Sequence, residues 1–355
     1  FLDTRGDPDG AAAAVDQAAA KGALAALGPV GERESLAAAA RAVATGLPIA
    51  LLSPGQAAAP DAGVFRLWPA VDWEAGEAVR VARSLGFDRL AILAPRDEQG
   101  TAEVDAFRAA ARAGGAEVVA AGQYDPTAGD LEPDLKSFLG LDPRSNRRLA
   151  RHLARHGVKN GWKTFSPDVD FDLLYIPDEH DRATLVAAYL PYFNVEVRTD
   201  ENMDVELLER KHGGRVPRLV QLLGSSGWHH PGLGPRGGAI VEWALVIDVF
   251  SGGGNDEASS DGAAAFAAAF ERHTGHPPGS LAAQAHDAAL LLLRARAAAA
   301  AAPDARAELR RRLRGARVDD GACSPAQVGA DGGLTRAAIL LRVDQGELVV
   351  EDSPN

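Results

Sequence analysis

Short apolar runs alternate with longer helical stretches through the first third of the chain. The helical stretches are Ala-rich and are closed by a glycine: residues 11–22, 34–45, 73–85 and 103–113. The apolar runs are bounded by turn-forming or charged residues: 23–27, 48–52, 89–94 and 117–122. This alternation is typical of βαβ units, so we expect a parallel sheet with helices on both faces.

Length and composition limit the fold and the kinds of function that are compatible with this sequence. The chain has 355 residues, 46% of them hydrophobic, and a net charge of −12. This length suits two lobes of ordinary domain size. The negative charge disfavours DNA or RNA as a partner, because nucleic-acid binders concentrate Lys and Arg. Cys323 is the single cysteine, so an intrachain disulfide and a thiolate metal cluster are both excluded. No apolar run approaches the roughly 20 residues of a membrane span.

A basic stretch at residues 141–165 interrupts the pattern, which then resumes. The basic residues of the stretch are Arg144, Arg147, Arg148, Arg151, Arg155, Lys159 and Lys163, with His152 and His156. The later expected strands are residues 171–176, 218–223 and 240–250, and the later expected helices are residues 182–190, 263–274 and 281–302. Residues 339–350 are expected to form a closing hairpin with its turn at 344–346.

Two clusters have the residue types of a metal site. Asp168, Asp170 and Asp172 alternate along an extended segment, which places three carboxylates on one face. The glycine and the closing glutamate of a calcium loop are missing, so a solvated approach to the next strand is favoured. His152 and His156 have a zinc-like spacing, but Leu153 stands where a metalloprotease has glutamate. We therefore expect no metal.

The motifs that suggest catalysis or nucleotide binding are weak. Residues 232–237 match GxGxxG but follow His229-His230-Pro231 rather than a strand. The serines of residues 224–227 lack nucleophile-elbow spacing. His286 and Asp287 are adjacent, so we expect their side chains to diverge on a helix. The sequence therefore predicts neither an enzyme nor a cofactor.

The order of several segments resembles the type I periplasmic binding proteins. These segments are Leu2-Asp3-Thr4, Leu27-Gly28-Pro29, Ser53-Pro54, Phe65-Arg66-Leu67-Trp68-Pro69, the run from Leu93 to Gly100, and Gln284-Ala285-His286-Asp287-Ala288. The branch they resemble is that of the leucine/isoleucine/valine-binding proteins. The runs 171–178 and 222–228 are similar to a sub-branch with outer-membrane lipoprotein activators of penicillin-binding proteins and related solute-binding lipoproteins.

The resemblance implies a two-lobed α/β fold, with a parallel sheet and helices on both faces in each lobe and three hinge crossings. Residues 1–69 and 251–335 would form the first lobe, without the family's first strand and helix. Residues 70–250 and 336–355 would form the second lobe, with the basic stretch 141–165 as an insertion. Such lobes close on a ligand.

The resemblance also implies ligand-binding residues. They are Glu32, Arg33, Ser53, Pro54 and Gly55 in the first lobe, and Gln99, Pro177, Asp178, Ser225, Ser226 and Trp228 in the second. Three of the expected groups are replaced. Glu32 stands where amino-acid binders hold the ligand carboxylate with serine, Gln99 replaces an aromatic residue, and the acidic partner of the ligand ammonium falls near Ser226. A polar or cationic ligand suits these changes.

Two functions follow from the resemblance. The first is a non-enzymatic extracytoplasmic protein that closes two lobes on a small polar ligand in the interlobe cleft. That ligand would be amino-acid-like or a derivative, and an ABC permease for transport or sensing would be the partner. The alternative is a lipoprotein interaction module that activates a penicillin-binding protein or peptidoglycan synthase of the cell envelope and binds no small molecule. The expected location is the periplasm, free or as an outer-membrane lipoprotein whose signal segment is absent from this chain. Neither function involves a cofactor, nucleic acid or a transmembrane segment.

Overall fold

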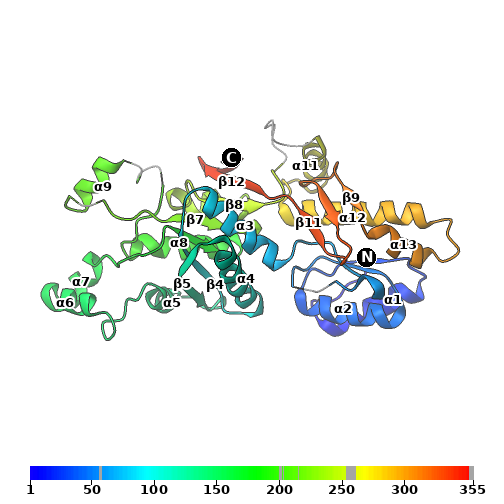
Figure 1. The fold of residues 1–355 in the computed structure, drawn as a ribbon, viewed down its shortest axis with the longest axis horizontal. Coiled ribbons are helices and arrows are strands. Elements are labelled where there is room, and N and C mark those ends of the chain that lie inside the picture. Colours follow the sequence, from blue (N-terminus) through cyan, green and yellow to red (C-terminus); the bar gives the residue numbers. More distant parts are fainter. Residues whose placement is uncertain (56–57, 200–201, 203, 215, 253–260, 352–355) are drawn as a thin grey trace. The chain divides into compact units, whose positions relative to one another are not determined.

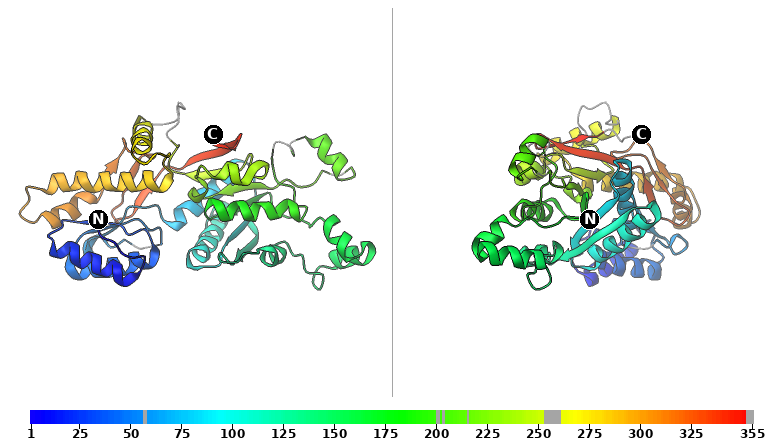
Figure 2. Two further views of the ribbon diagram at one scale, coloured as in Figure 1. Left: turned by 180° about the vertical axis from the view of Figure 1, so that it is seen from behind. Right: turned by 60° about the vertical axis from the view of Figure 1, so that its left-hand side comes forward.

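The chain forms two compact units, each built from two separate stretches of sequence (Figures 1 and 2). The computed structural model describes residues 1–55, 58–199, 202, 204–214, 216–252 and 261–351. Unit 1 comprises residues 1–73 and 249–338, and unit 2 comprises residues 74–248 and 339–355. The chain therefore passes between the units three times, a few residues away from the boundaries expected from the sequence.

Unit 1 contains a three-stranded parallel sheet and a three-stranded antiparallel sheet. The parallel strands, in the order β1-β2-β3, are β1 (Ala26–Leu27), β2 (Ile49–Leu51) and β3 (Val64–Arg66). The antiparallel strands, in the order β11-β10-β9, are β11 (Leu334–Arg336), β10 (Ala326–Val328) and β9 (Arg317–Val318). The sequence did not predict the antiparallel sheet, because strands of two or three residues are too short to show a period.

Helices cover both faces of the parallel sheet of unit 1. They are α1 (Pro8–Ala20), α2 (Glu32–Thr45), α12 (Ser280–Ala299) and α13 (Ala305–Leu313), whereas α11 (Asp261–Thr274) packs against Phe250 in a separate cluster. Val15 of α1 and Ala38 of α2 are buried with Ile49 on one face. Leu291 of α12 is buried with Phe65 on the other face. The two-sided burial explains why these strands are continuously apolar.

Unit 2 is organised around a seven-stranded sheet with the order β13-β12-β8-β7-β6-β4-β5. The parallel strands are β4 (Arg89–Pro95), β5 (Glu117–Tyr124), β6 (Leu173–Ile176), β7 (Gln221–Gly224) and β8 (Leu245–Asp248). The expected hairpin is confirmed as β12 (Ile339–Asp344) and β13 (Glu347–Val350), which pair antiparallel, and β12 also pairs antiparallel with β8.

Helices cover this sheet on both faces as well. The helices of unit 2 are α3 (Val71–Ser84), α4 (Glu98–Gly114), α5 (Glu132–Phe138), α6 (Arg147–His156), α7 (Val158–Thr164), α8 (His180–Tyr192), α9 (Val205–Lys211) and α10 (Leu233–Gly237), and two of them show the covering of each face. Phe107 of α4 stacks on Tyr175 of β6 with ring centroids 5.3 Å apart. On the opposite face, Val186 and Leu190 of α8 share a core with Leu174 and Ile176 of the same strand.

Local sequence signals fix several helix ends. Asp7 and Asp97 cap α1 and α4, because their carboxylates accept hydrogen bonds from the backbone N–H groups of Gly10 (2.6 Å) and Gly100 (2.7 Å). Gly115 ends α4 in the left-handed conformation, with φ 72°. These terminal residues turn the chain back toward the sheet, so each strand is followed by a helix that lies against it.

One expected strand needs correction. The run 240–250 is not extended throughout: it opens in a 3-10 turn at Gly238–Ile240, and Trp243 adopts a φ of 67° before β8 begins. The backbone carbonyl of Trp243 accepts a 2.7 Å hydrogen bond from the Gln221 amide, which holds this turn. The expectation that His152 and His156 lie on a helix within the basic stretch is confirmed: the stretch contains the two helices α6 and α7.

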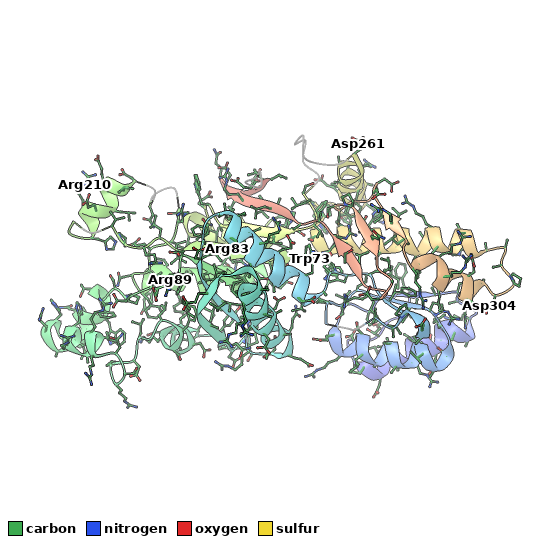
Figure 3. The ribbon with its side chains drawn as sticks, in the orientation of Figure 1. Trp73, Arg83, Arg89, Arg210, Asp261 and Asp304 are labelled. Carbon is green, nitrogen blue, oxygen red and sulfur yellow. The ribbon has the colours of Figure 1, made fainter. Side chains whose placement is uncertain are left out.

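The first crossing between the units lies within α3, at Trp73 (labelled in Figure 3). The Trp73 indole N–H donates a 3.0 Å hydrogen bond to the carbonyl of Arg336, which belongs to the same unit. Among the described residues, no helix has both the length and the apolar character needed to cross a membrane.

Candidate functional site

The carboxyl ends of the parallel strands in unit 2 converge on one edge of the sheet. In open α/β sheets, ligands bind at this edge, in the loops that follow the strands. Here Asp178 follows β6, Ser225 and Ser226 follow β7, and Asp248 ends β8. The structure therefore brings the expected second-lobe residues Asp178, Ser225 and Ser226 to the edge where a binding site is expected.

Hydrogen bonds join the loops after β6 and β7. The Ser225 hydroxyl donates a 3.4 Å hydrogen bond to the Asp178 carbonyl. A Cβ atom added at Gly227 would lie 2.7 Å from the same carbonyl oxygen, so only glycine permits this approach. The Asp178 carboxylate accepts hydrogen bonds from the Tyr124 hydroxyl and from the Glu179 backbone N–H. The Asp178 side chain is thus held in place by β5 and by its own loop.

Glu74 of α3 is a site residue that the sequence analysis missed. Its carboxylate accepts a 2.7 Å hydrogen bond from the Ser226 backbone N–H. Burial, with smaller contributions from the Asp248 and Glu179 carboxylates, raises the pKa of Glu74 to about 7, although hydrogen bonding to Ser226 opposes the shift. The sequence does carry a signal for this residue, because Glu74 is a charged residue directly before the small and apolar residues that α3 buries.

The neighbouring carboxyl groups are also disfavoured in their charged form. Burial raises the pKa of Asp178, and the nearby Asp181 and Asp97 carboxylates add to the shift. Burial, followed by the charge of Asp178, raises the pKa of Glu179. We call Glu74, Asp178, Glu179 and Asp248 the acidic edge. A positively charged group bound there would relieve the mutual repulsion of these carboxylates.

Another carboxyl group, which is not part of the acidic edge, is buried beside the sheet. Glu103 of α4 is buried, and burial followed by the charge of Glu74 raises its pKa well above the usual range. Tyr175 of β6 is fully buried, and burial followed by the charge of Glu103 raises its pKa. The Glu103 Oε2 atom and the Tyr175 hydroxyl have no hydrogen-bond partner among the described residues. Burial therefore disfavours the charged form of the Glu103 carboxyl group.

Two histidines of the loop after β7 have different surroundings. His229 Nδ1 contacts the carboxylate of Asp248, which is buried. His230 stacks on His180 of α8, with ring centroids 3.8 Å apart and an interplanar angle of 10°. Burial followed by the proximity of His230 lowers the pKa of His180. His229 therefore contacts the acidic edge, whereas His230 forms a separate ring pair with His180.

The remaining second-lobe predictions lie in different environments. Gln99 is exposed on the first turn of α4, and Pro177 is buried directly after β6. Trp228 is fully buried, its indole N–H donates a 3.0 Å hydrogen bond to the Ile176 carbonyl, and its ring packs over Gly224. The described contacts of Trp228 are thus contacts of the core.

In unit 1, the predicted residues lie around the end of β2 and the start of α2. A Cβ atom added at Gly55 would lie 2.1 Å from the Glu32 carboxylate, so the two residues are in close contact. Ser53 is fully buried, and its hydroxyl has no hydrogen-bond partner among the described residues. Pro54 is half-buried and Arg33 is exposed. The structure therefore places Glu32 beside the Ser53-Pro54-Gly55 turn.

A buried ion pair in unit 1 was also missed. Asp287 and Arg336 are both completely buried and pair at 2.9 Å, and Asp287 also accepts hydrogen bonds from the backbone N–H groups of Ala322 (2.6 Å) and Cys323 (3.1 Å). The expectation that His286 and Asp287 diverge is wrong: His286 Nδ1 lies 3.2 Å from the Asp287 carboxylate. Asp287 is tied by its other contacts to segments of unit 1, which indicates a structural role.

The three alternating aspartates each pair with a different arginine. Asp168 pairs with Arg148 at 2.9 Å, Asp172 pairs with Arg218 at 2.5 Å, and Asp170 pairs with Arg89, which is labelled in Figure 3. These ion pairs agree with the interpretation as a structural lead-in to β6. Across the described ranges, no group of three or more His, Cys, Asp or Glu side chains is arranged to hold a metal ion.

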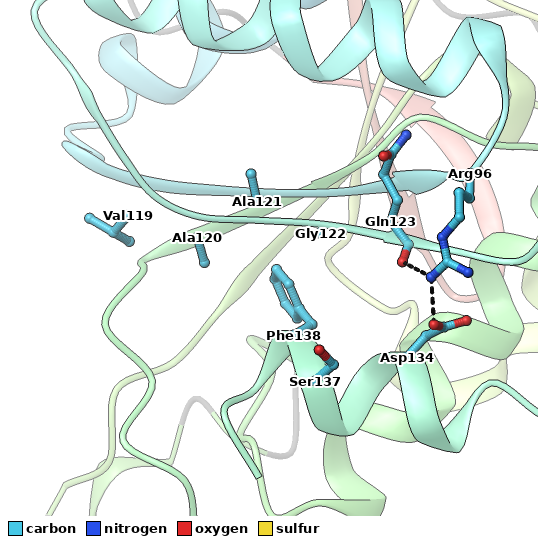
Figure 4. Close-up of a pocket in the computed structure, with 9 residues that line it drawn as sticks. All are labelled: Arg96, Val119, Ala120, Ala121, Gly122, Gln123, Asp134, Ser137 and Phe138. Atoms are coloured by element: carbon cyan, nitrogen blue, oxygen red, sulfur yellow. Dashed lines mark hydrogen bonds and ion pairs between the residues drawn. The ribbon is translucent and has the colours of Figure 1, made fainter. Parts of the chain in front are cut away.

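A pocket opens beside the edge strand β5 of unit 2 (Figure 4). Its lining residues are Arg96, Val119, Ala120, Ala121, Gly122, Gln123, Asp134, Ser137 and Phe138. The Arg96 guanidinium pairs with Asp134 at 2.7 Å and donates a 3.0 Å hydrogen bond to the Gln123 carbonyl. The only cation of the pocket lining is therefore already neutralised, and none of the predicted ligand residues is part of the lining.

Comparison with solved structures shows the same fold in several solute-binding proteins. A leucine-binding protein from Thermotoga maritima is 19% identical, with a TM-score of 0.66 over 99% of this chain and 85% of that chain. The branched-chain amino acid transporter substrate-binding protein from Streptococcus pneumoniae, in complex with isoleucine, is 16% identical, with a TM-score of 0.67 over 98% and 85%. A solute-binding protein of an ABC transporter from Rhodopseudomonas palustris, in complex with 4-hydroxybenzoate, is 15% identical, with a TM-score of 0.68 over 97% and 82%.

Comparison at the sequence level gives the family. No curated protein matches the chain. The profile of the periplasmic binding protein family matches residues 1–230 and 244–347, which is nearly the whole chain. This match agrees with the two α/β units, the three crossings and the parallel sheets described above. The chain therefore belongs to the periplasmic binding protein family, with the type I fold.

Proposed function

We propose that this protein is a non-enzymatic, extracytoplasmic solute-binding protein whose ligand is a small polar molecule with a positively charged group. Family membership supports solute binding and an extracytoplasmic location. The solved relatives include proteins in complex with isoleucine and with 4-hydroxybenzoate, so the ligand has to be argued from the residues of this chain. An amino-acid-like molecule or a derivative that carries an ammonium group fits these residues.

The acidic edge is the observation that carries the proposal. Four carboxyl groups gather where the parallel strands of unit 2 end, and burial together with repulsion from neighbouring carboxylates raises the pKa values of Glu74, Asp178 and Glu179. A cation bound at such a site interacts favourably with these carboxylates and offsets the electrostatic cost of holding them together in the free protein. Glu32 in unit 1, in the position where the resemblance places a carboxylate-binding serine, disfavours an anionic group for the same reason.

The roles of the other predicted residues follow from this chemistry. Ser225 and Ser226 offer hydroxyl groups beside Asp178, and Ser53 offers a buried hydroxyl in unit 1. We still predict that the remaining candidate residues contact the ligand, namely Arg33, Pro54, Gly55, Gln99, Pro177 and Trp228. An ABC permease is the proposed partner, as for the transporter proteins with the same fold. Attachment to the outer membrane as a lipoprotein stays a prediction.

A thermal-shift screen tests the proposal. The panel contains amino acids, amides, polyamines and peptidoglycan fragments, with neutral and anionic analogues of each cationic compound. A ligand present at 100 times its Kd stabilises the protein by about 2.7 kcal/mol, which produces a clear shift. We expect shifts from ammonium-bearing compounds and none from their uncharged analogues.

Two matched variants locate the effect. Asp178→Asn removes one negative charge from the acidic edge, and Asp105→Asn removes one from an exposed position on α4. Losing a charge-assisted hydrogen bond to the ligand costs roughly 1.5–3 kcal/mol, so Asp178→Asn should weaken binding about 10- to 100-fold while Asp105→Asn leaves it unchanged. Shifts caused only by anionic compounds, or equal binding by both variants, would contradict the proposal.

A further inference from the structure

The helices α6 and α7 of unit 2 concentrate positive charge. They lie next to each other in unit 2 (Figures 1 and 2). Between residues 143 and 163 there is no carboxylate, in a chain whose net charge is −12. The cationic side chains of this segment are Arg144, Arg147, Arg148, Arg151, Arg155, Lys159 and Lys163. The charge of this segment is thus opposite to that of the protein as a whole.

The inner side of α6 is apolar and packed. Leu149 is fully buried in the core of unit 2. A Cβ atom added at Gly161 would lie 2.8 Å from Leu153, so α7 lies close against α6 at this glycine. His152 Nε2 is 3.0 Å from the Thr164 hydroxyl, which joins the two helices again. With this side occupied, the opposite side of α6 faces solvent.

The outer side of α6 carries the arginines. Arg147, Arg151 and Arg155 recur every four residues, which places them in one row on a helix, about 6 Å apart along its axis. All three are exposed, as are Arg144, Lys159 and Lys163. Arg148 differs from them in having a carboxylate partner: it pairs with Asp168 at 2.9 Å and lies over the Phe165 ring at 4.4 Å.

The other six cations have no carboxylate partner among the described residues, and we call them the basic face. Like charges at this spacing repel each other, so the basic face is electrostatically unfavourable in isolation. Negative charges on a bound partner would offset this repulsion. The basic face therefore has the properties of a docking surface for an anionic partner.

Hydrogen bonds hold the basic face in a fixed position on unit 2. The Asn146 side chain accepts a 2.9 Å hydrogen bond from the Leu149 N–H and donates one of 2.9 Å to the Gly140 carbonyl. The Asn194 side chain donates a 2.9 Å hydrogen bond to the Phe165 carbonyl directly after α7. A preformed surface loses little conformational freedom when a partner binds.

We propose that the basic face docks unit 2 onto the anionic headgroups of a lipid membrane surface. Arg147, Arg151 and Arg155 form an extended row on α6 rather than a pocket, which suits a surface with repeated negative charges. Val158, the first residue of α7, is 67% exposed and lies between Arg155 and Lys159 in sequence, where an apolar side chain can enter the headgroup region. The extracytoplasmic location of the family favours lipid over nucleic acid.

Vesicle co-sedimentation tests this proposal. Purified protein is mixed with vesicles of phosphatidylglycerol and phosphatidylcholine, or of phosphatidylcholine alone, at low and high ionic strength. The test variant combines Arg147→Gln, Arg151→Gln and Arg155→Gln, since glutamine keeps the helix propensity of arginine. The control variant combines Arg108→Gln, Arg112→Gln and Arg272→Gln, which changes the net charge equally at exposed positions elsewhere.

We expect the wild type and the control variant to bind the anionic vesicles alike. The test variant should bind them on the order of 100-fold more weakly, because each cation near the surface contributes about 1 kcal/mol. High salt should abolish binding, and neutral vesicles should not bind. Equal loss in both variants, no binding by the wild type, or capture by soluble polyglutamate or duplex DNA without vesicle binding would overturn the proposal. Circular dichroism of both variants checks that the helices are retained.

Discussion

The raised pKa of Glu74 makes a quantitative prediction about stability. Its pKa rises from 4.5 to about 7 in the folded protein, which at about 1.36 kcal/mol per unit amounts to about 3 kcal/mol. The folded state binds this proton more tightly than the unfolded state. The free energy of unfolding should therefore fall as the pH rises from 4.5 to 7, and the full cost should be present above pH 7.

The substitution Glu74→Gln isolates this effect. Glutamine keeps an acceptor for the Ser226 N–H but carries no charge. At pH 8 we expect the variant to be more stable than the wild type by up to about 3 kcal/mol, whereas at pH 5 the two should be nearly equal. Removal of a charged residue is thus expected to stabilise the protein, which makes the prediction informative.

Hydrogen exchange followed by mass spectrometry is the suitable assay. A chain with two units need not unfold in one step, whereas peptides from β6 and β7 report the opening of unit 2 alone. Wild type and variant are compared at the same pH, so the intrinsic exchange rates cancel. The control is Glu77→Gln on the same helix, where Glu77 forms a 2.7 Å ion pair with exposed Arg80. A pair of this kind contributes at most about 1 kcal/mol.

Either of two results would refute the prediction for Glu74→Gln. If Glu74→Gln changes the opening free energy of unit 2 equally at pH 5 and pH 8, the carboxyl group is not strained by burial. If the variant is less stable than the wild type at pH 8, ionised Glu74 stabilises the fold, and the electrostatic account of the acidic edge is wrong.

Two further substitutions test the packing of each unit. Asp287→Asn removes the charge that balances fully buried Arg336, so unit 1 should lose about 3–5 kcal/mol, measured by denaturant unfolding or as lost exchange protection in β10 and β11. Gly234→Ala places a methyl group 1.9 Å from the Gly346 carbonyl oxygen and should destabilise unit 2 by about 1–3 kcal/mol, whereas Gly76→Ala on α3 meets open space and should be neutral or stabilising; equal melting temperatures of the two alanine variants would refute the close approach.

The fold was predictable because its signals are local. Strands such as Leu90–Leu93 are continuously apolar, the helices between them end at glycines, and the order of these elements resembles a known family. The hairpin 339–350 was predictable from its alternation and its central turn. The antiparallel strands β9 to β11 were not, because two or three residues carry too little pattern.

The site was only partly predictable, because its decisive contacts join distant parts of the sequence. Asp178, Ser225 and Ser226 follow strands, and a strand end is visible in the sequence. Glu74 reaches Ser226 from a helix that lies more than a hundred residues earlier, and this contact appears only after folding. The same holds for Asp287 and Arg336, whose pairing depends on how the last strands of unit 1 return to α12.

The central claim is that the acidic edge binds a small cationic solute, and isothermal titration calorimetry tests it most directly. The solute with the largest thermal shift is titrated into the wild type, into Asp178→Asn and into the control Asp105→Asn. The account predicts one solute per chain for the wild type, the same affinity for the control, and an affinity about 10- to 100-fold lower for Asp178→Asn. Unchanged affinity in Asp178→Asn, or tighter binding of an uncharged analogue, would contradict it.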